Sequence, residues 1–279
     1  MPETTNGDAV TYLLTLSDDE LGRYRLMADQ AKANEAELWH QAGIVEGADV
    51  ADIGCGPGAL LSAWAEAVAP TGHVTAVDAD ATAVATAGAL ITANGLERVS
   101  VRQGRADRTG LAAESFDAIM LRHVLAHNGG AEDAIVGHLA TLLRPGGCLF
   151  LVDVDITAAR FVPDDVDIND LMDRYAGFHT KLGNDMQAGL HLGERLSRAG
   201  LEVLEFRGRY TIMPVPQGMR GPAWAAREAL LSAGAATQDD IARWEAAYDR
   251  IDRASQRPTG FLPSFVAIGQ KPPLPAVSI

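Results

Sequence analysis

The chain contains little of what marks a secreted, metal-binding or membrane-spanning protein. Its 279 residues include only two cysteines, Cys55 and Cys148, too few for a disulfide framework or a cysteine-based zinc site. No apolar run approaches the roughly 20 residues that a transmembrane helix needs, and the first residues lack the apolar core of a signal peptide. These absences exclude the disulfide-rich and membrane classes, and we expect a cytoplasmic protein that binds no metal and no membrane.

Positive charge is also scarce. Lys and Arg together number 23, against 37 Asp and Glu, which gives a formal net charge of −14. The sequence has no basic stripe of the kind that neutralises phosphates in proteins that bind DNA or RNA. We therefore expect no nucleic-acid partner.

What the chain does have is a glycine-rich turn directly after an apolar strand. The strand, residues 48–53, runs into Gly54, Gly56 and Gly58, and a helical pattern follows. Glycine is needed where φ is positive or where a ligand approaches main-chain atoms closely. The next strand ends in Asp78, and an acid there can accept hydrogen bonds from both hydroxyls of a ribose. Together the two features predict a nucleoside-binding crevice.

The glycines fit two ligand templates. Gly54-x-Gly56-x-x-Ala59 is the dinucleotide pattern, a weak signal on its own, and Gly54-x-Gly56-x-Gly58 is a tighter pattern. Asp52 stands two residues before the loop, where its carboxylate would repel a pyrophosphate and attract an ammonium group. S-adenosylmethionine carries an adenosine, an ammonium and a sulfonium, and no phosphate. The loop therefore favours this ligand over NAD.

Four stretches of the sequence, taken together, resemble the class I S-adenosylmethionine-dependent methyltransferases. They are residues 52–58, Asp78, residues 116–119 and residues 143–147. The resemblance implies an α/β fold, a Rossmann-like, doubly wound, seven-stranded sheet (the methyltransferase fold) with an N-terminal helix and helical cap insertions. It also implies S-adenosyl-L-methionine as cofactor, S-adenosyl-L-homocysteine as its product, and in-line displacement of the methyl group by an acceptor.

The N-terminal segment, residues 12–30, is similar to the leading helix of the ubiquinone/menaquinone-type methyltransferases. This bacterial subgroup acts mainly on small metabolites, often in antibiotic or pigment pathways of secondary metabolism. Its leading helix helps to close the cofactor site, which singles out Tyr12, Tyr24 and Gln30; the alternative is that Tyr24 only packs the helix onto the sheet. The resemblance favours a small aromatic or apolar acceptor and leaves O-, N- and C-methylation open.

The resemblance also assigns cofactor contacts, with one departure at Arg105. Relatives often have an acid there that accepts from the adenine amino group. Arg105 can stack on the ring instead, with Asp107 replacing the acid or the backbone holding the adenine alone. Arg122 can meet the methionine carboxylate, and Asp78 has the alternative role of capping the next helix. The residues expected to bind the cofactor are Tyr24, Gln30, Asp52, Gly54, Cys55, Gly56, Gly58, Asp78, Ala79, Arg105, Ala106, Asp107, Arg122 and His123.

Three histidines are candidates for a general base. His123 and His127 follow the fourth strand four residues apart, within reach of each other if that segment is helical. His179 lies in the first insertion, near Asn184, which is expected to line the acceptor pocket or to form a loop. Histidine suits proton transfer near neutral pH, and the alternative is that these residues only fasten loops. A base is required only if the acceptor must lose a proton.

Periodicity and turn residues divide the chain into four parts. They are an N-terminal helical lid (1–47), a cofactor-binding core (48–155), a cap insertion (156–187), and the rest of the core (188–279) with a helical insertion at 214–260. The insertions are expected to cover the crevice. They can instead form a homo-oligomer contact, in which Trp224, Trp244 and Tyr248 would pack against a second subunit.

The pattern predicts alternating strands and helices. Strands are expected at 48–53, 73–77, 98–103, 116–121, 147–153, 201–209 and 263–269, and helices at 17–42, 58–68, 80–93, 131–143, 166–182, 188–199, 222–233 and 238–254. Two other functions stay open: a methyltransferase-fold enzyme that performs a cyclisation, rearrangement or decarboxylation with the cofactor bound, and a regulator that has lost catalysis.

Overall fold

The computed structural model describes residues 18–275, with side chains from residue 21 onward. Tyr12 and the cap expected at Ser17 lie outside the described residues. In chain order the elements are α1 (Asp18–Gln41), β1 (Asp49–Ile53), α2 (Leu61–Val68), β2 (His73–Asp78), α3 (Ala81–Ala93), β3 (Val99–Gln103), β4 (Phe116–Arg122), η1 (Leu125–His127), α4 (Glu132–Leu142), β5 (Leu143–Val154), η2 (Ile156–Ala158), β6 (Arg160–Val162), α5 (Val166–Lys181), η3 (Ala188–His191), α6 (Leu192–Arg198), β7 (Glu202–Pro214), α7 (Pro222–Ala225), α8 (Arg227–Ser232), α9 (Gln238–Arg253) and β8 (Thr259–Gln270).

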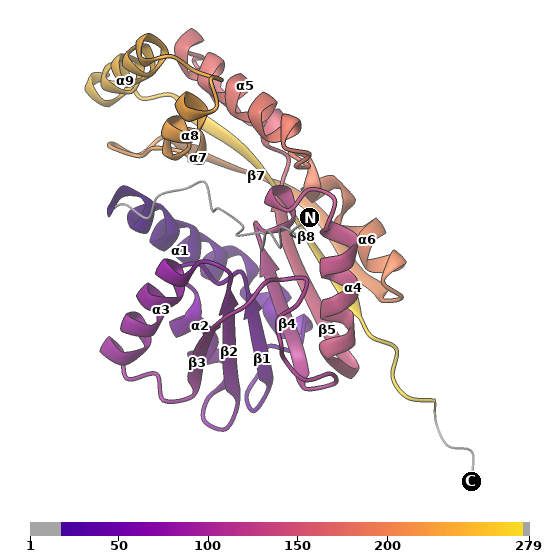
Figure 1. Ribbon diagram of the computed structural model, residues 1–279. Coiled ribbons are helices and arrows are strands. Elements are labelled where there is room, and N and C mark those ends of the chain that lie inside the picture. Colours follow the sequence, from indigo (N-terminus) through magenta and orange to yellow (C-terminus); the bar gives the residue numbers. More distant parts are fainter. Residues whose placement is uncertain (1–17, 276–279) are drawn as a thin grey trace, which may run out of the picture.

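The strands form one sheet in which β3, β2, β1, β4 and β5 run parallel in that order. β8 pairs antiparallel with β5, and β7 and β6 pair antiparallel with β8 (Figure 1). Helices α1, α2 and α3 pack on one face, and α4 and α6 pack on the other. The parallel strands are therefore buried on both sides, which is why they read as nearly continuous apolar runs.

The predicted fold class is confirmed, and the expected number of strands is one too low. The sheet has eight strands because β6, which lies in the first insertion, pairs with the end of β8. β7 and β8 are both longer than predicted and pair along their whole length, from Glu202 to Pro214. A strand of three residues before Pro163 has too short an alternation to be recognised in a sequence.

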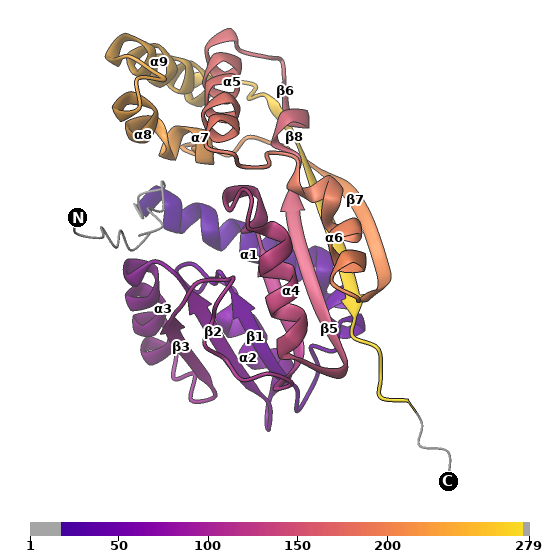
Figure 2. The ribbon, with the colours of Figure 1, turned by 45° about the vertical axis from the view of Figure 1, so that its right-hand side comes forward.

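Two of the predicted helices are each divided in the structure. The segment 188–199 becomes η3 and α6, and the segment 222–233 becomes α7 and α8. Helix α1 lies between α2 and α3 on one side and helices α5, α7, α8 and α9 on the other (Figure 2). Trp39 of α1 packs edge-on against Trp64 of α2 with ring centroids 4.5 Å apart, which fastens α1 to the sheet side of the molecule.

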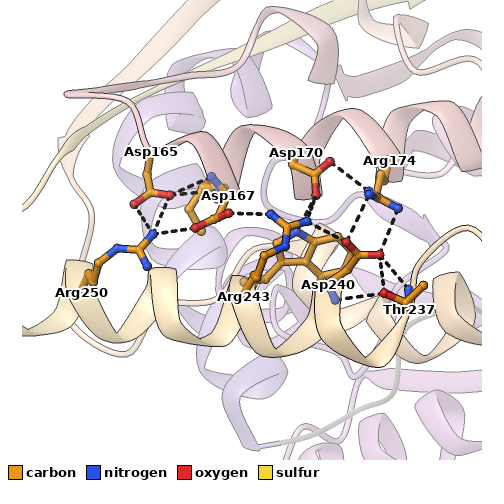
Figure 3. A network of polar contacts seen from close by, with 10 residues as sticks. Asp165, Asp167, Asp170, Arg174, Thr237, Asp240, Arg243 and Arg250 are labelled. Carbon is orange, nitrogen blue, oxygen red and sulfur yellow. Dashed lines mark hydrogen bonds and ion pairs between the residues drawn. The ribbon is translucent and has the colours of Figure 1, made fainter.

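An ion-pair network joins the two insertions (Figure 3). It links α5 and the residue before it to α9. Arg243 of α9 reaches Asp167 and Asp170, while Arg250 reaches Asp165 and Asp167. The side chain of Arg174 crosses in the other direction to Asp240. We call these helices, with α7 and α8, the cap.

The aromatic side chains of the cap face inward. Trp244 is fully buried and donates its indole N–H to Asp170, with 3.0 Å between the atoms. Tyr248 is also buried and packs edge-on against Trp224, with ring centroids 5.4 Å apart. The expectation that Trp244 and Tyr248 pack against a second subunit is therefore wrong, because both side chains form the interior of the cap.

Candidate active site

The carboxyl ends of the parallel strands meet at one edge of the sheet, which is where open α/β sheets bind their ligands. The glycine loop follows β1, and Asp78 is the last residue of β2. His123 follows β4, and Asp153 lies near the end of β5. α1 and the cap lie beyond this edge (Figure 1). The fold thus brings four chemically distinct features of the sequence to one place.

The glycine loop needs its glycines mainly for its own geometry. Gly54, Gly56 and Gly58 have φ values of 72°, 55° and 86°, in the left-handed region that other residues rarely adopt. A Cβ on Gly54 would lie 2.3 Å from the Val124 side chain, and one on Gly58 would lie 2.8 Å from that of Leu61. At Gly54 and Gly58 packing alone excludes a side chain, a reason that the sequence did not reveal.

Asp78 is tied to the glycine loop. Its Oδ2 accepts a hydrogen bond from the Gly56 N–H at 2.8 Å, and its Oδ1 accepts from the Asp80 N–H at 2.9 Å. Burial raises the pKa of the Asp78 carboxyl, and these backbone donors oppose the rise. A carboxylate oxygen can accept two bonds, so each still has capacity for a ligand hydroxyl. The residue that caps α3 is Asp80, through Thr82 N–H, and not Asp78.

Asp52 lies beneath the loop with only 4% of its surface exposed. It accepts a hydrogen bond from the Trp64 indole at 3.0 Å. Burial raises the pKa of its carboxyl to about 6, although Trp64 and the nearby Arg122 oppose the rise. Burial likewise raises the pKa of the Cys55 thiol, which keeps this loop cysteine protonated at neutral pH. The loop therefore rests on a partly protonated acid rather than on a solvated charge.

Helix α1 brings Tyr24 to the loop and Gln30 elsewhere. A Cβ on Gly56 would lie 3.4 Å from the Tyr24 ring, and the Arg23 guanidinium lies over the same ring, 5.0 Å from its centroid. The Gln30 amide instead contacts Met213 Sδ on β7 at 3.1 Å. Of these two α1 residues, the structure brings only Tyr24 to the glycine loop.

A buried glutamate, Glu35 of α1, was not predicted from the sequence. It pairs with Arg122 at the end of β4 and with Arg209 of β7, the latter at 2.6 Å. An ordinary glutamate on a helix carries no signal that two arginines from distant strands will surround it. The Nε of Arg122 is buried and has no hydrogen-bond partner among the residues that the structure describes. Arg122 thus has one donor left over at the edge of the sheet.

The segment after β3 pairs its two charged residues with each other. Arg105 donates to both carboxylate oxygens of Asp107, at 2.9 and 3.0 Å. The hydrogen bond from Arg105 lowers the pKa of Asp107. Ala106, between them, is partly buried, and the Ala79 carbonyl accepts from the Gln103 amide at 2.9 Å. Arg105 and Asp107 were expected to contact the adenine, by stacking and as an acceptor. In the structure these two side chains are hydrogen-bonded to each other.

His127, the last residue of η1, contacts His179 of the cap helix α5. Their ring centroids are 5.1 Å apart, and the Tyr175 ring lies 4.5 Å from that of His179. The Gly129 N–H donates to Asn184 Oδ1, so the Asn184 amide nitrogen donates to His179 Nδ1 at 2.8 Å. Burial lowers the pKa of His127 to about 4 and also lowers that of His179. Both shifts favour the neutral imidazole, and within the described part of the chain the buried Nε2 of His179 has no hydrogen-bond partner.

His123 stands apart from that pair, beside an acid that we did not predict as a site residue. Its Nδ1 lies 4.0 Å from Oδ1 of Asp153, which is 1% exposed. Burial raises the pKa of Asp153 to about 7, and burial followed by Arg122 lowers the pKa of His123 well below its usual value. The position of Asp153, near the carboxyl end of a buried strand, was a signal that could have identified it.

The sequence predicts neither a metal site nor a membrane-spanning helix. Between residues 18 and 275, no group of three or more His, Cys, Asp or Glu side chains is arranged to hold a metal ion. Within the same part of the chain, no helix has the length and apolar character needed to cross a membrane.

Comparison with known proteins identifies the central part of the chain. Residues 50–147 match the family described as methyltransferase domain. The chain is 37% identical over 101 residues to nocamycin O-methyltransferase of Saccharothrix syringae, covering 36% of each protein. It is 36% identical over 115 residues to ubiquinone biosynthesis O-methyltransferase of Xanthomonas axonopodis pv. citri, covering 41% of this chain and 46% of that protein. The chain thus spans less than half of these curated relatives.

The likeness to solved structures extends over most of the chain and concerns the fold. The YcgJ protein of Bacillus subtilis superposes with a TM-score of 0.57 at 19% identity, covering 85% of this chain and 97% of that one. The [4+2]-cyclase SpnF superposes with a TM-score of 0.54 at 19% identity, covering 89% and 81%. The fold is therefore shared with proteins of distant sequence.

Proposed function

We propose that this chain, whose residues 50–147 match the family described as methyltransferase domain, is a class I S-adenosylmethionine-dependent methyltransferase that transfers a methyl group to a small-molecule acceptor. S-adenosylmethionine is the cofactor of this family. The observation that carries the proposal is the pairing of Asp78 with the Gly56 N–H. It fixes a carboxylate at the glycine loop, with lone pairs left over for the two hydroxyls of a ribose.

Two further features of the site fit this cofactor. The unpartnered Nε of Arg122 is a buried donor whose natural partner is an anionic oxygen such as the methionine carboxylate. Tyr24 lies against the loop at Gly56. From there its ring would cover the nucleoside of a bound cofactor. A single buried donor without a partner costs about 1–3 kcal/mol, and this cost is offset when a ligand supplies the acceptor.

The chain acts on the reaction mainly by orientation. When bound, the cofactor supplies an electrophilic methyl group on a sulfonium. Asp78 and Arg122 hold the two ends of the site, and the cap excludes water from the acceptor side. Fixing an acceptor atom in line with the methyl group contributes about 7–11 kcal/mol through orientation. A base is needed in addition only for an acceptor that must lose a proton.

The acceptor that suits the described residues is small and aromatic or apolar. His179 of the cap helix α5 makes edge-on contacts with His127 and with Tyr175, and burial lowers the pKa of both histidines, which favours their uncharged form. The named relatives that act in nocamycin and ubiquinone biosynthesis are O-methyltransferases. These names support our proposal that the chain acts in small-molecule biosynthesis, with oxygen as the first atom to test.

Calorimetric titration with S-adenosylmethionine tests the cofactor assignment. Wild-type protein should bind with one-to-one stoichiometry. Asp78→Ala should lose about 100-fold to 10,000-fold in affinity, because two charge-assisted hydrogen bonds of about 1.5–3 kcal/mol each are removed. The matched control is Asp80→Ala, which removes only the cap of α3 and should leave the affinity within about threefold. Folded wild-type protein that binds no cofactor would falsify the proposal.

A second candidate is a non-methylating reaction such as a cyclisation, rearrangement or decarboxylation with the cofactor retained. The likeness to a [4+2]-cyclase supports keeping it, although at 19% identity that likeness concerns the fold. The two candidates differ in what they consume. Methyl transfer releases one S-adenosylhomocysteine for each product molecule, whereas the second candidate leaves the cofactor intact.

A further inference from the structure

His123 and Asp153 are neighbours because their strands are neighbours. β4 and β5 are paired in parallel register, with Arg122 opposite Val152, and each residue of interest comes directly after this pair. The backbone N–H of His123 donates to the Val152 carbonyl at 2.8 Å. This bond fixes the start of the loop, and it leaves His123 Nδ1 4.0 Å from Asp153 Oδ1, a gap that a rotation of the imidazole can close.

The Asp153 carboxylate is held rigidly. Its Oδ2 accepts from the Ala126 N–H at 3.1 Å, and its Oδ1 accepts from the Val154 N–H at 3.0 Å. It is 1% exposed, so solvent does not compete for its remaining lone pairs. Oδ1, the oxygen nearer the imidazole, therefore keeps capacity for one more hydrogen bond.

The backbone at His123 is strained. Its φ of 55° lies in the left-handed region, and among the described residues only Glu114 shares this property without being glycine. Such a conformation costs on the order of 1–3 kcal/mol and is concentrated at functional sites. The side chain of His123 is 25% exposed, and the next residue, Val124, packs against Gly54 of the glycine loop. The left-handed conformation thus holds a partly exposed imidazole beside the glycine loop.

We propose that Asp153 positions His123 as the general base of the reaction, with Nδ1–H directed at Asp153 Oδ1 and the Nε2 lone pair directed at the acceptor. The inference rests on the proposed methyl transfer and names its acceptor class, a hydroxyl on an aromatic or enolic carbon. The O–H bond of the acceptor breaks and its proton goes to Nε2. The released electron pair forms the bond to the methyl carbon, and the pair of the methyl–sulfur bond stays on sulfur.

The charges around the pair determine how it responds to pH. Arg122, Arg23 and His127 all disfavour a proton on His123, in addition to burial. The carboxyl of Asp153 is buried and faces the further negative charge of Asp185, and its pKa is raised to about 7. Below that pH the neutral carboxyl donates a hydrogen bond to Nδ1, so the proton of the neutral imidazole stays on Nε2. Above it, the carboxylate accepts from Nδ1–H, which frees Nε2.

Nitrogen-15 NMR of the histidine ring of the full chain tests this positioning without an acceptor. In wild-type protein the neutral His123 should change from the Nε2–H to the Nδ1–H tautomer as the pH rises through about 7. Asp153→Asn should abolish this pH-dependent change, and Asp153→Glu should restore it. The matched control is Asp155→Asn, since Asp155 caps η2 through the Thr157 N–H and should leave the change intact.

A neutral His123 that remains the Nε2–H tautomer above pH 7 in wild-type protein would overturn the inference, and so would an unaltered pH-dependent change in folded Asp153→Asn. The wild-type titration decides alone if that variant does not fold. Calorimetry with S-adenosylmethionine on the same samples separates this result from the proposed function. If the protein binds the cofactor but its neutral His123 stays in the Nε2–H tautomer above pH 7, only the role of Asp153 is contradicted. Absent binding contradicts the methyl transfer itself.

Discussion

The edge of the sheet and the cap treat their carboxylates in opposite ways. At the edge, burial raises the pKa values of Asp52 and Asp153 to about 6 and about 7. In the cap, hydrogen bonds from Arg243 and Thr237 lower the pKa of Asp240 to about 2. For Asp170, burial opposes the shift, but Arg174, Trp244 and Arg243 outweigh it and the pKa also falls.

This difference separates function from architecture. Acids with raised pKa values can exchange protons near neutral pH, and such groups concentrate at functional sites. Asp170 and Asp240 of the cap have lowered pKa values, so they stay ionised at physiological pH, and both pair with Arg174 and Arg243. The cap is therefore held together by paired charges, whereas the edge keeps acids that are poised to change their protonation.

The largest expected effect is on the edge side of this comparison. A folded-state pKa above the unfolded value means that Asp153 stabilises the fold less as the pH rises from about 4 to about 7. Chemical denaturation across this range should show wild-type protein losing stability relative to Asp153→Asn by up to about 4 kcal/mol, the equivalent of about three pKa units. Parallel pH profiles for the two proteins would contradict the raised pKa.

A second prediction concerns the packing of the edge at Gly54. Gly54→Ala should destabilise the fold by about 2–4 kcal/mol, because the new Cβ both requires a positive φ and overlaps Val124. Gly95→Ala is the matched control: its φ is also positive, at 61°, but nothing lies within 4 Å of a Cβ there. That control should cost only about 1 kcal/mol. Equal costs in urea denaturation would show that the overlap is relieved freely.

The smallest expected effect is on the cap side. Arg243 joins Asp167, Asp170 and Asp240, so Arg243→Ala should weaken the contact between α5 and α9 and speed hydrogen exchange in both helices. Arg253 makes one exposed pair with Asp249 within α9, and Arg253→Ala should cost less than about 0.5 kcal/mol. Cofactor affinity should not change in either variant. Faster exchange in β1 or β2 would show that the cap and the edge are not separate.

The sequence allowed the edge to be predicted much better than the cap. The apolar run of β1 ends at a glycine and that of β2 ends at an acid, so local pattern alone located the loop and Asp78. Asp153 was missed although its position near the end of a buried strand was a usable signal, and the pairing of Arg105 with Asp107 depends on how their shared loop folds. Glu35 was not predicted, because its role depends on side chains from other elements. The pairing of α5 with α9 was not predictable for the same reason, since the matched charges are about 70–85 residues apart in the chain.

Mass spectrometry of a reaction with methyl-labelled S-adenosylmethionine and cell extract tests the central claim most directly. The account predicts an enzyme-dependent small molecule that carries the label on oxygen, formed in step with an equal amount of S-adenosylhomocysteine. A small-molecule product that forms without label and without S-adenosylhomocysteine would contradict it.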